Sequence, residues 1–242
     1  MPNRFAAHAL VTGANRGLGL EWVHQLTGRV DRLFATCRRP EEATQLQEHA
    51  AAHSGTVDVS PLDVADESSI ERVADDIGQE VDTLDLLVNN AGISGGGGSD
   101  RFGTVDQETM MQVLRVNTVG PHLLVQACAD LLRAGGDERP ATVVNVTSSF
   151  GSIAQAGGGG WHSYRASKAG LNMMSRVEAA ELQADDVVVV AMNPGWVRTD
   201  MGGSGAHISP ETSVTGMIDV LSGLGPDDTG RYMTYDGREM PW

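Results

Sequence analysis

The chain has 242 residues and a net charge of −15, with 17 basic against 32 acidic side chains. Its length suffices for one well-buried α/β domain and is short for two, so we expect a single dinucleotide-binding oxidoreductase domain over residues 1–242. The acidic balance argues against a nucleic-acid partner, and no apolar run approaches a membrane span.

Short apolar runs bounded by turn residues predict seven strands. They cover 7–11, 32–36, 57–62, 84–89, 142–146, 187–192 and 231–234. Helical periodicity between them predicts helices at 18–26, 41–51, 68–77, 107–133, 163–182 and 211–221. Such alternation calls for a doubly wound α/β fold: a mostly parallel seven-stranded sheet with helices on both faces, as in the Rossmann fold.

Local signals mark several helix starts. Ser68 and Glu71 have the spacing of a capping box, Asp106 can cap the long helix, and Pro40 restricts the entry to another. These signals agree with the helix starts that periodicity predicts.

Two glycine clusters, 95–98 and 157–160, follow the fourth and fifth predicted strands. In an open α/β sheet, ligands bind beyond the carboxyl ends of the strands, so flexible loops there could frame a substrate mouth. A plain surface linker is an equally good interpretation.

A third glycine-rich segment, 12–19, follows the first predicted strand and opens the first predicted helix. Glycines in that position permit a tight turn and let backbone amides approach a pyrophosphate at the helix N-terminus. We therefore predict nucleotide binding rather than a purely structural turn. The candidate contacts are Gly13, Asn15, Arg16, Gly17, Leu18 and Gly19.

Lys168 is the only lysine among the 17 basic residues, and it lies four positions after Tyr164. That spacing places both side chains on one helix face, one turn apart. A free tyrosine titrates near ~10, and a nearby ammonium would lower the pKa of Tyr164 and make it a proton donor near neutrality. By itself, such a pair also occurs on ordinary solvated helix faces.

Six motifs, in order along nearly the whole chain, resemble those of the short-chain dehydrogenase/reductase family. They are the glycine spacing of 13–19, Asn-Asn-Ala-Gly at 89–92, Asn117 in the long helix, the strand and serines of 144–149, Tyr164 with Lys168, and the Pro-Gly segment 193–199. Within the family, segments 151–153, 164–172 and 236–242 resemble the sniffer and C-factor branch. The resemblance implies a carbonyl reductase-like enzyme that works on a small-molecule carbonyl and forms a homodimer or homotetramer through its long helices.

The resemblance also implies roles for individual residues. The catalytic set would be Asn117, Ser148, Tyr164 and Lys168. Cofactor contacts beyond the glycine-rich segment would come from Asp63, Val64, Asn90, Ala91, Gly92, Tyr164, Lys168, Pro194, Gly195, Val197 and Thr199. Asp63 would contact adenine, and Asn117 would connect the lysine to solvent through water.

Ser148 and Ser149 are neighbours, and only one can face the site from a strand end. We choose Ser148, because the family serine lies three positions after an asparagine and three before a glycine, as Asn145 and Gly151 do here. The gap to Tyr164 is longer than usual in the family because of glycine cluster 157–160, which leaves the geometry of the lid open.

Charge at the end of the second predicted strand bears on the cofactor. An acidic residue there would bind a ribose 2′-hydroxyl, whereas a basic one would accept a 2′-phosphate. Arg38 and Arg39 follow that strand, and Arg16 adds a cation within the glycine-rich turn. We predict NADP over NAD, with Arg38 and Arg16 binding the 2′-phosphate. The alternative is that Arg38 and Arg39 are solvent-exposed residues at the end of a strand and bind no ligand.

Other candidates are weaker. His49 and His53 have a spacing that can bind metal, but no third ligand is evident, so we predict a solvated face and no metal. Cys37 and Cys128 are far apart and indicate reduced thiols. Because the first apolar run begins near residue 6, we see no room for a signal peptide and expect a cytoplasmic protein. Trp161 either lines a substrate pocket or packs a loop.

Together these features predict carbonyl reduction by hydride transfer from NADPH. Tyr164 would be the general acid, Ser148 would hold the carbonyl oxygen, and Lys168 would lower the pKa of the tyrosine. The alternative hypothesis is an NADP-binding signalling protein of the C-factor type with little or no turnover.

Overall fold

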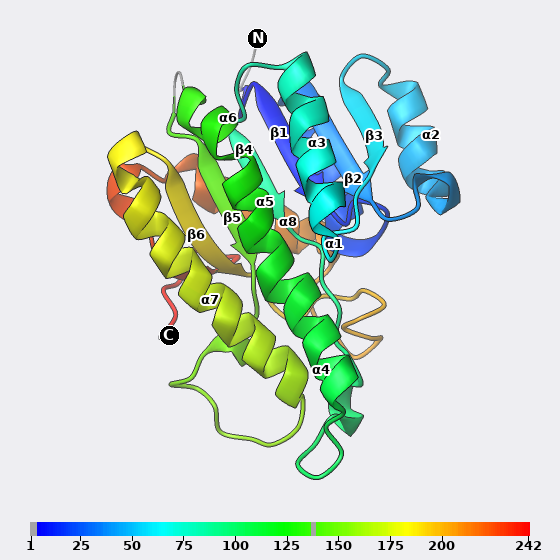
Figure 1. The fold of residues 1–242 in the computed structure, drawn as a ribbon, viewed down its shortest axis with the longest axis vertical. Helices are drawn as coiled ribbons and strands as arrows, with labels where there is room; N and C mark the ends of the chain where they lie inside the picture. The colour runs from blue at the N-terminus through cyan, green and yellow to red at the C-terminus, as the bar shows by residue number, and fades with distance from the viewer. Residues whose placement is uncertain (1–3, 137–138) are drawn as a thin grey trace.

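The computed structural model describes residues 4–136 and 139–242. Its centre is one sheet with strand order β3-β2-β1-β4-β5-β6-β7, in which every pairing is parallel (Figure 1). The strands are β1 (His8–Thr12), β2 (Arg32–Cys37), β3 (Val57–Pro61), β4 (Leu86–Asn89), β5 (Thr142–Val146), β6 (Val188–Asn193) and β7 (Tyr232–Thr234). The predicted doubly wound, seven-stranded sheet is confirmed.

Helices cover both faces of the sheet. They are α1 (Gly17–Leu26), α2 (Thr44–Ala52), α3 (Glu67–Glu80), α4 (Gln107–Leu114), α5 (Gly120–Ala127), α6 (Ala129–Ala134), α7 (His162–Leu182) and α8 (Pro210–Ser222). Apolar residues of α1, α2 and α8 form a buried cluster on one face, and those of α3, α5, α6 and α7 form another on the opposite face. Since β6 is buried at every position, it needs this double cover.

The predicted helix 107–133 is not continuous. After α4, residues Arg115–Val119 form a π turn, α5 begins at Gly120, and α6 follows a bend at Cys128. Pro121 has no backbone N–H to donate to the preceding turn. At Gly120 the helix passes so close to the loop after β3 that a Cβ would lie 2.0 Å from the Val64 carbonyl oxygen. Side-chain periodicity does not reveal such an insertion.

Two predicted helix starts were wrong, and one was confirmed. The carboxylate of Asp66 caps α3 by accepting the Ser68 N–H, so Ser68 is not the cap. Pro40 opens a separate 3-10 turn (Pro40–Glu42), and α2 starts only at Thr44. Asp106 caps α4 as predicted, accepting the Thr109 N–H at 2.8 Å. Throughout the described residues, no helix has the length and apolar character needed to cross a membrane.

Candidate active site

Ser148 lies where the chain leaves β5. It caps a 3-10 turn (Ser149–Gly151), and its Oγ accepts the Phe150 N–H at 3.2 Å. Ser148 is half-buried, whereas Ser149 is exposed. Of the two serines, Ser148 therefore has the more sheltered position, which favours the choice made from the sequence.

Tyr164 and Lys168 lie one turn apart near the start of α7. Lys168 is 4% exposed, and its Nζ donates to the Val146 carbonyl oxygen at 2.7 Å. The same Nζ is 5.8 Å from the centre of the Tyr164 ring. Gly151 permits this close packing, since a Cβ there would lie 2.9 Å from the Lys168 main chain. The structure thus brings serine, tyrosine and lysine together at the carboxyl end of β5.

The pKa of Tyr164 is raised, not lowered. Burial is the main cause, and a hydrogen bond with Ser148 offsets part of it. Burial also lowers the pKa of Lys168, to about 8. The predicted depression of the Tyr164 pKa by Lys168 is wrong for this arrangement, because burial raises that pKa and the Lys168 ammonium donates to the Val146 carbonyl instead. The tyrosine is held protonated, which is the form that an acid requires.

Asn117 lies within the π turn and is fully buried. Its Oδ1 accepts the Ile93 N–H at 2.8 Å, and its Nδ2 donates to the Ile93 carbonyl at 2.8 Å and to Ser167 Oγ at 3.0 Å. A Cβ on Gly92 would lie 3.3 Å from Asn117 Oδ1 and 3.8 Å from Lys168 Nζ. Asn117 therefore borders the lysine, but its side chain holds the segment after β4 rather than Lys168 itself.

The glycine-rich turn joins β1 to α1, as the sequence predicted. Gly13 and Gly17 have φ of 66° and 55°, which favours glycine at both positions. A Cβ on Gly19 would lie 2.1 Å from the Gly13 carbonyl oxygen. The turn is therefore tightly packed at the N-terminus of α1, with Asn15, Arg16 and Leu18 between the glycines.

Asn90 and Ala91 tie the end of β4 to this turn. Asn90 Nδ2 donates to the Thr12 carbonyl at 2.8 Å, and the Asn90 and Ala91 N–H groups both donate to Thr12 Oγ1 at 3.0 Å. The neighbouring Asn89 donates to Asn145 Oδ1 at 2.8 Å across the sheet. The Asn-Asn-Ala-Gly segment thus links the glycine-rich turn to the strand that carries Ser148.

Arg38, which the sequence predicts to bind a 2′-phosphate, follows β2 and is exposed. Among the described residues it forms no ion pair, whereas Arg39 pairs with Glu42. Arg16 forms an ion pair of 2.6 Å with Asp200. Of the two arginines predicted to meet at a 2′-phosphate, only Arg38 is without a carboxylate partner here.

Asp63 and Val64 follow β3 on the same edge. Asp63 Oδ1 accepts the Ala65 N–H at 2.9 Å, so the carboxylate shapes its own turn. The Val64 carbonyl lies against Gly120 of α5. Both residues follow the carboxyl end of β3, on the side where ligands bind in open α/β sheets.

The Pro-Gly segment leads out of β6. The Pro194 carbonyl accepts Ser213 Oγ at 2.7 Å, and Asn193 Oδ1 accepts the Gly195 N–H at 3.1 Å. Val197 pairs with Ile208 in an isolated bridge. Thr199 comes back to the glycine-rich turn, where a Cβ on Gly17 would lie 3.2 Å from its Cγ2. The segment therefore spans the site from the end of β6 to the start of α1.

Aromatic residues surround Tyr164. The rings of Phe150 and Trp161 lie 6.3 Å and 5.9 Å from the Tyr164 ring, and 5.7 Å from each other. Trp161 adopts left-handed φ of 58°, which is uncommon for a bulky residue. Next to it is a hollow of about 480 Å³ lined by Gly98, Arg101, Phe102, Gly159, Gly160, Trp161 and His162. Residues of both glycine clusters therefore line one hollow, which Trp161 separates from Tyr164 by a ring-to-ring distance of 5.9 Å.

A histidine cluster lies away from this site. The sequence offered only His49 and His53, but His24 of α1 is a third member: its ring lies 4.7 Å from that of His49, which lies 4.3 Å from that of His53. Even so, no group of ligands among the described residues is arranged to hold a metal ion. Neither Cys37 nor Cys128 forms a disulfide, and burial raises the pKa of the Cys128 thiol to about 12.

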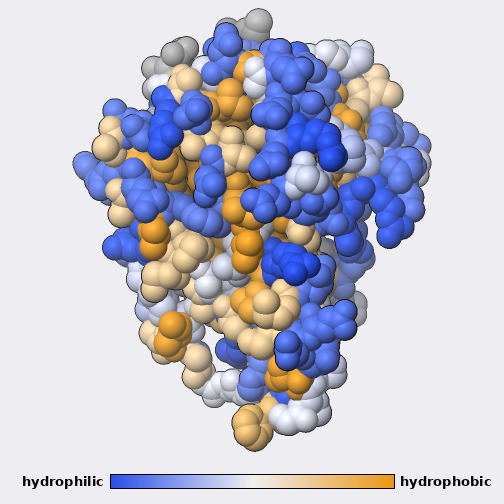
Figure 2. Space-filling view, in the orientation of Figure 1, coloured by the Kyte–Doolittle hydropathy of each residue, from blue (hydrophilic) through white to orange (hydrophobic). Residues whose placement is uncertain are grey.

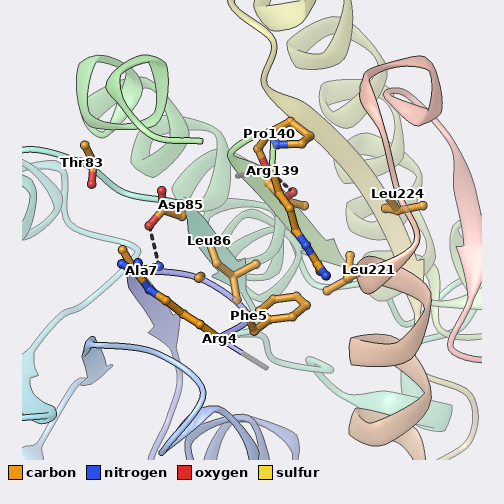
Figure 3. Close-up of a pocket in the computed structure, with 12 residues that line it drawn as sticks. Arg4, Phe5, Ala7, Thr83, Asp85, Leu86, Arg139, Pro140, Leu221 and Leu224 are labelled. Carbon is orange, nitrogen blue, oxygen red and sulfur yellow. Dashed lines mark hydrogen bonds between the residues drawn. The ribbon is translucent and has the colours of Figure 1, made fainter. Parts of the chain in front are cut away.

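A second hollow, of about 70 Å³, lies at the amino ends of β1, β4 and β5, remote from Ser148 (Figure 3). Asp85 there accepts the N–H groups of Ala7 and His8, both at 2.8 Å. The Arg139 guanidinium lies 5.8 Å from the ring of Phe5. These side chains fasten the start of β1 and offer no catalytic set.

Comparisons with known proteins agree with this geometry. A family model described as short chain dehydrogenase matches residues 7–207. An NADPH-bound carbonyl reductase from chicken fatty liver is 36% identical, with a TM-score of 0.91 and full coverage of both chains. The carbonyl reductase Sniffer of D. melanogaster is 33% identical, with a TM-score of 0.93, over 98% of this chain and 100% of that one. C-signal of Myxococcus xanthus is 42% identical over 159 residues, which is 66% of this chain and 93% of its own. The chain belongs to the short-chain dehydrogenase family.

Proposed function

We propose that the protein is an NADPH-dependent carbonyl reductase that converts an aldehyde, ketone or quinone to an alcohol. One observation carries the proposal: Ser148, Tyr164 and Lys168 lie together at the carboxyl end of β5, with the single lysine of the chain buried among them. The NADPH-bound relative from chicken, similar over the whole chain, supports the choice of reaction.

The residues present fit such a cofactor. Gly13, Gly17 and Gly19 let the chain turn tightly at the N-terminus of α1, where backbone N–H groups would bind a pyrophosphate. Arg38, which is exposed and forms no ion pair among the described residues, would accept the 2′-phosphate, and Asp63 and Val64 would contact adenine. Asn90, Ala91, Gly92, Pro194, Gly195, Val197 and Thr199 would line the rest of the site.

In the proposed mechanism, the cofactor supplies a hydride to the carbonyl carbon. Tyr164 donates its phenolic proton to the carbonyl oxygen, and burial keeps that proton in place until the oxygen becomes basic. Ser148 holds the same oxygen by a hydrogen bond. Lys168 is close enough to stabilise the tyrosinate left behind, and Asn117 fixes the segment that borders the lysine.

The substrate would enter at the mouth between the glycine clusters. Trp161 lines this mouth and its ring also packs beside Tyr164, so the pocket interpretation of Trp161 is the one we favour. Because cells keep NADPH largely reduced, we propose carbonyl reduction as the physiological direction. We also propose that the protein works in the cytoplasm.

The test is a titration with NADPH and NADH by fluorescence, followed by NADPH oxidation with a panel of aldehydes, quinones and diketones. We expect tighter binding of NADPH and turnover that is lost in Tyr164→Phe while cofactor binding is kept. Binding of NADPH without turnover of any carbonyl would contradict a reductase, and a preference for NADH would contradict the role of Arg38.

A second candidate is an NADP-binding signalling protein with little turnover. The similarity to C-signal favours it. Tyr164→Phe separates the two in a strain in which loss of the gene has a phenotype. If the variant binds NADPH but does not rescue, catalysis matters; full rescue would favour signalling.

A further inference from the structure

Tyr232, which no motif singled out, reaches the catalytic serine. It begins β7 and is 1% exposed, and its hydroxyl donates to the Ser148 carbonyl oxygen at 2.6 Å. β6 lies between β7 and β5, so this hydrogen bond crosses beyond the end of the intervening strand. It joins an edge strand to the point where Ser148 leaves the sheet.

The other hydrogen bond that the Ser148 carbonyl accepts comes from its own turn, from the Gly151 N–H at 2.8 Å. Because both ends of this hydrogen bond lie within the turn, it does not fix the orientation of Ser148 relative to the sheet. The adjacent Thr147 is fixed, since its N–H donates to Met192 and its Oγ1 to Asn172. Tyr232 supplies the corresponding anchor one residue later, at Ser148 itself.

We propose that Tyr232 is a positioning residue that orients Ser148 toward Tyr164 and the carbonyl oxygen. The inference rests on the proposed function. The Tyr232 ring is held in turn by Trp242, at 5.2 Å between ring centres. Burial raises the pKa of Tyr232 to about 12, so the hydroxyl stays a donor across the working pH range.

Loss of this anchor has two consequences. Ser148 would hold the carbonyl oxygen less well, which lowers kcat without weakening cofactor binding. Ser148 would also bond Tyr164 less well, and because that bond lowers the Tyr164 pKa, the pKa would rise. The high-pH limb of the rate profile, where Tyr164 loses its proton, would then move to higher pH.

The experiment compares Tyr232→Phe, Ser148→Ala and the double variant. We expect Tyr232→Phe to lower kcat about five- to ten-fold, the effect of losing one hydrogen bond, with an unchanged Kd for NADPH. In the Ser148→Ala background the same change should have almost no further effect on kcat or on the pH limb. Effects that multiply in the double variant, or an unchanged kcat in Tyr232→Phe, would overturn the proposal.

Two further measurements keep the result unambiguous. Ile218→Val, a buried change on α8 away from the site, controls for general destabilisation. The chain has only three tyrosines, so ¹³Cζ-tyrosine NMR can follow Tyr164 directly without turnover. Tyr232→Phe should raise the pKa of Tyr164. In the Ser148→Ala background the same change should leave the pKa of Tyr164 where it is. If the wild type turns over no carbonyl, the reductase proposal fails, while the NMR coupling still decides the role of Tyr232.

Discussion

At the scale of single residues, position 168 has the strictest requirement for one residue type, which is lysine. The Lys168 side chain is buried, and its compact ammonium donates a hydrogen bond to the Val146 carbonyl oxygen. A larger, planar guanidinium does not reproduce this geometry. We expect Lys168→Arg to lower kcat by on the order of 100-fold while the protein stays folded. Steady-state kinetics with circular dichroism checks this, and Arg72→Lys, an exposed change on α3, is the matched control. Near wild-type rates in Lys168→Arg would mean that charge alone suffices.

Asp200 is a second residue whose effect can be measured. It pairs with Arg16, so it would compete with a 2′-phosphate for that cation if Arg16 binds one as the sequence predicts. Because both side chains are largely exposed, the pair stabilises by only ~0.2–1 kcal/mol. Asp200→Asn should therefore tighten NADPH binding about two- to five-fold and leave NADH binding nearly unchanged. Fluorescence titration measures both, with Glu71→Gln as control; equal changes for the two cofactors would rule out this competition.

The sequence predicted the residues that motifs carry, and these lie near one another in the structure. Ser148, Tyr164 and Lys168 were found because short spacing and residue type are visible in one dimension. The partners Asp200 of Arg16 and Tyr232 of Ser148 were not found, since they lie 184 and 84 residues away along the chain. The pKa of Tyr164 was misjudged for a related reason: burial is a property of the packed protein.

At the scale of elements, the strands and most helices were predictable because apolar patterns follow burial. The division of the helix after Asp106 was not, since neither the π turn nor the close approach of Gly120 to the Val64 carbonyl leaves a mark on the apolar pattern. This π turn carries Asn117, so the element most difficult to predict also holds a candidate site residue.

The turn between β1 and α1 depends on close approach at Gly19. A Cβ there would lie 2.1 Å from the Gly13 carbonyl oxygen and 2.6 Å from Asn90 Nδ2. We expect Gly19→Ala to lower the free energy of unfolding by ~1–3 kcal/mol and to weaken NADPH binding. Gly78→Ala is the matched control: it lies inside α3 with no atom within 4 Å, and should stabilise by ~0.5–1 kcal/mol. Denaturant unfolding measures both, and equal effects would contradict the contact.

Helices α5 and α7 are joined by His122 and the buried Glu178, 2.9 Å apart. The hydrogen bond with Glu178 raises the pKa of His122. A raised folded-state pKa gives stability that is fully present below the unfolded value of ~6.5 and is lost as pH rises through the folded pKa. His122→Gln should therefore lower Tm more at pH ~6 than at pH ~8.5. A loss of Tm that is the same at both pH values would contradict this linkage.

At the scale of the whole molecule, apolar side chains gather on the face formed by α4 and α7. Met111, Val119, Met173 and Val177 are exposed there, and Figure 2 shows orange and tan surface on this side. We propose that it is covered in a homodimer or homotetramer. Light scattering after size exclusion should give an oligomer, and a monomer for Met173→Glu with Val177→Glu. Gln47→Glu on α2 is the control for added charge, and a monomeric wild type would contradict the proposal.

The central claim is that Tyr164 assists hydride transfer from NADPH to a carbonyl. The most direct measurement uses NADPH carrying deuterium at C4 and any carbonyl that the panel identifies, with the product analysed by mass spectrometry and NMR. We predict deuterium on the new carbinol carbon, and almost none with Tyr164→Phe although that variant binds NADPH. Deuterium transfer that does not depend on Tyr164, or bound NADPH that transfers none to any carbonyl, would contradict the account.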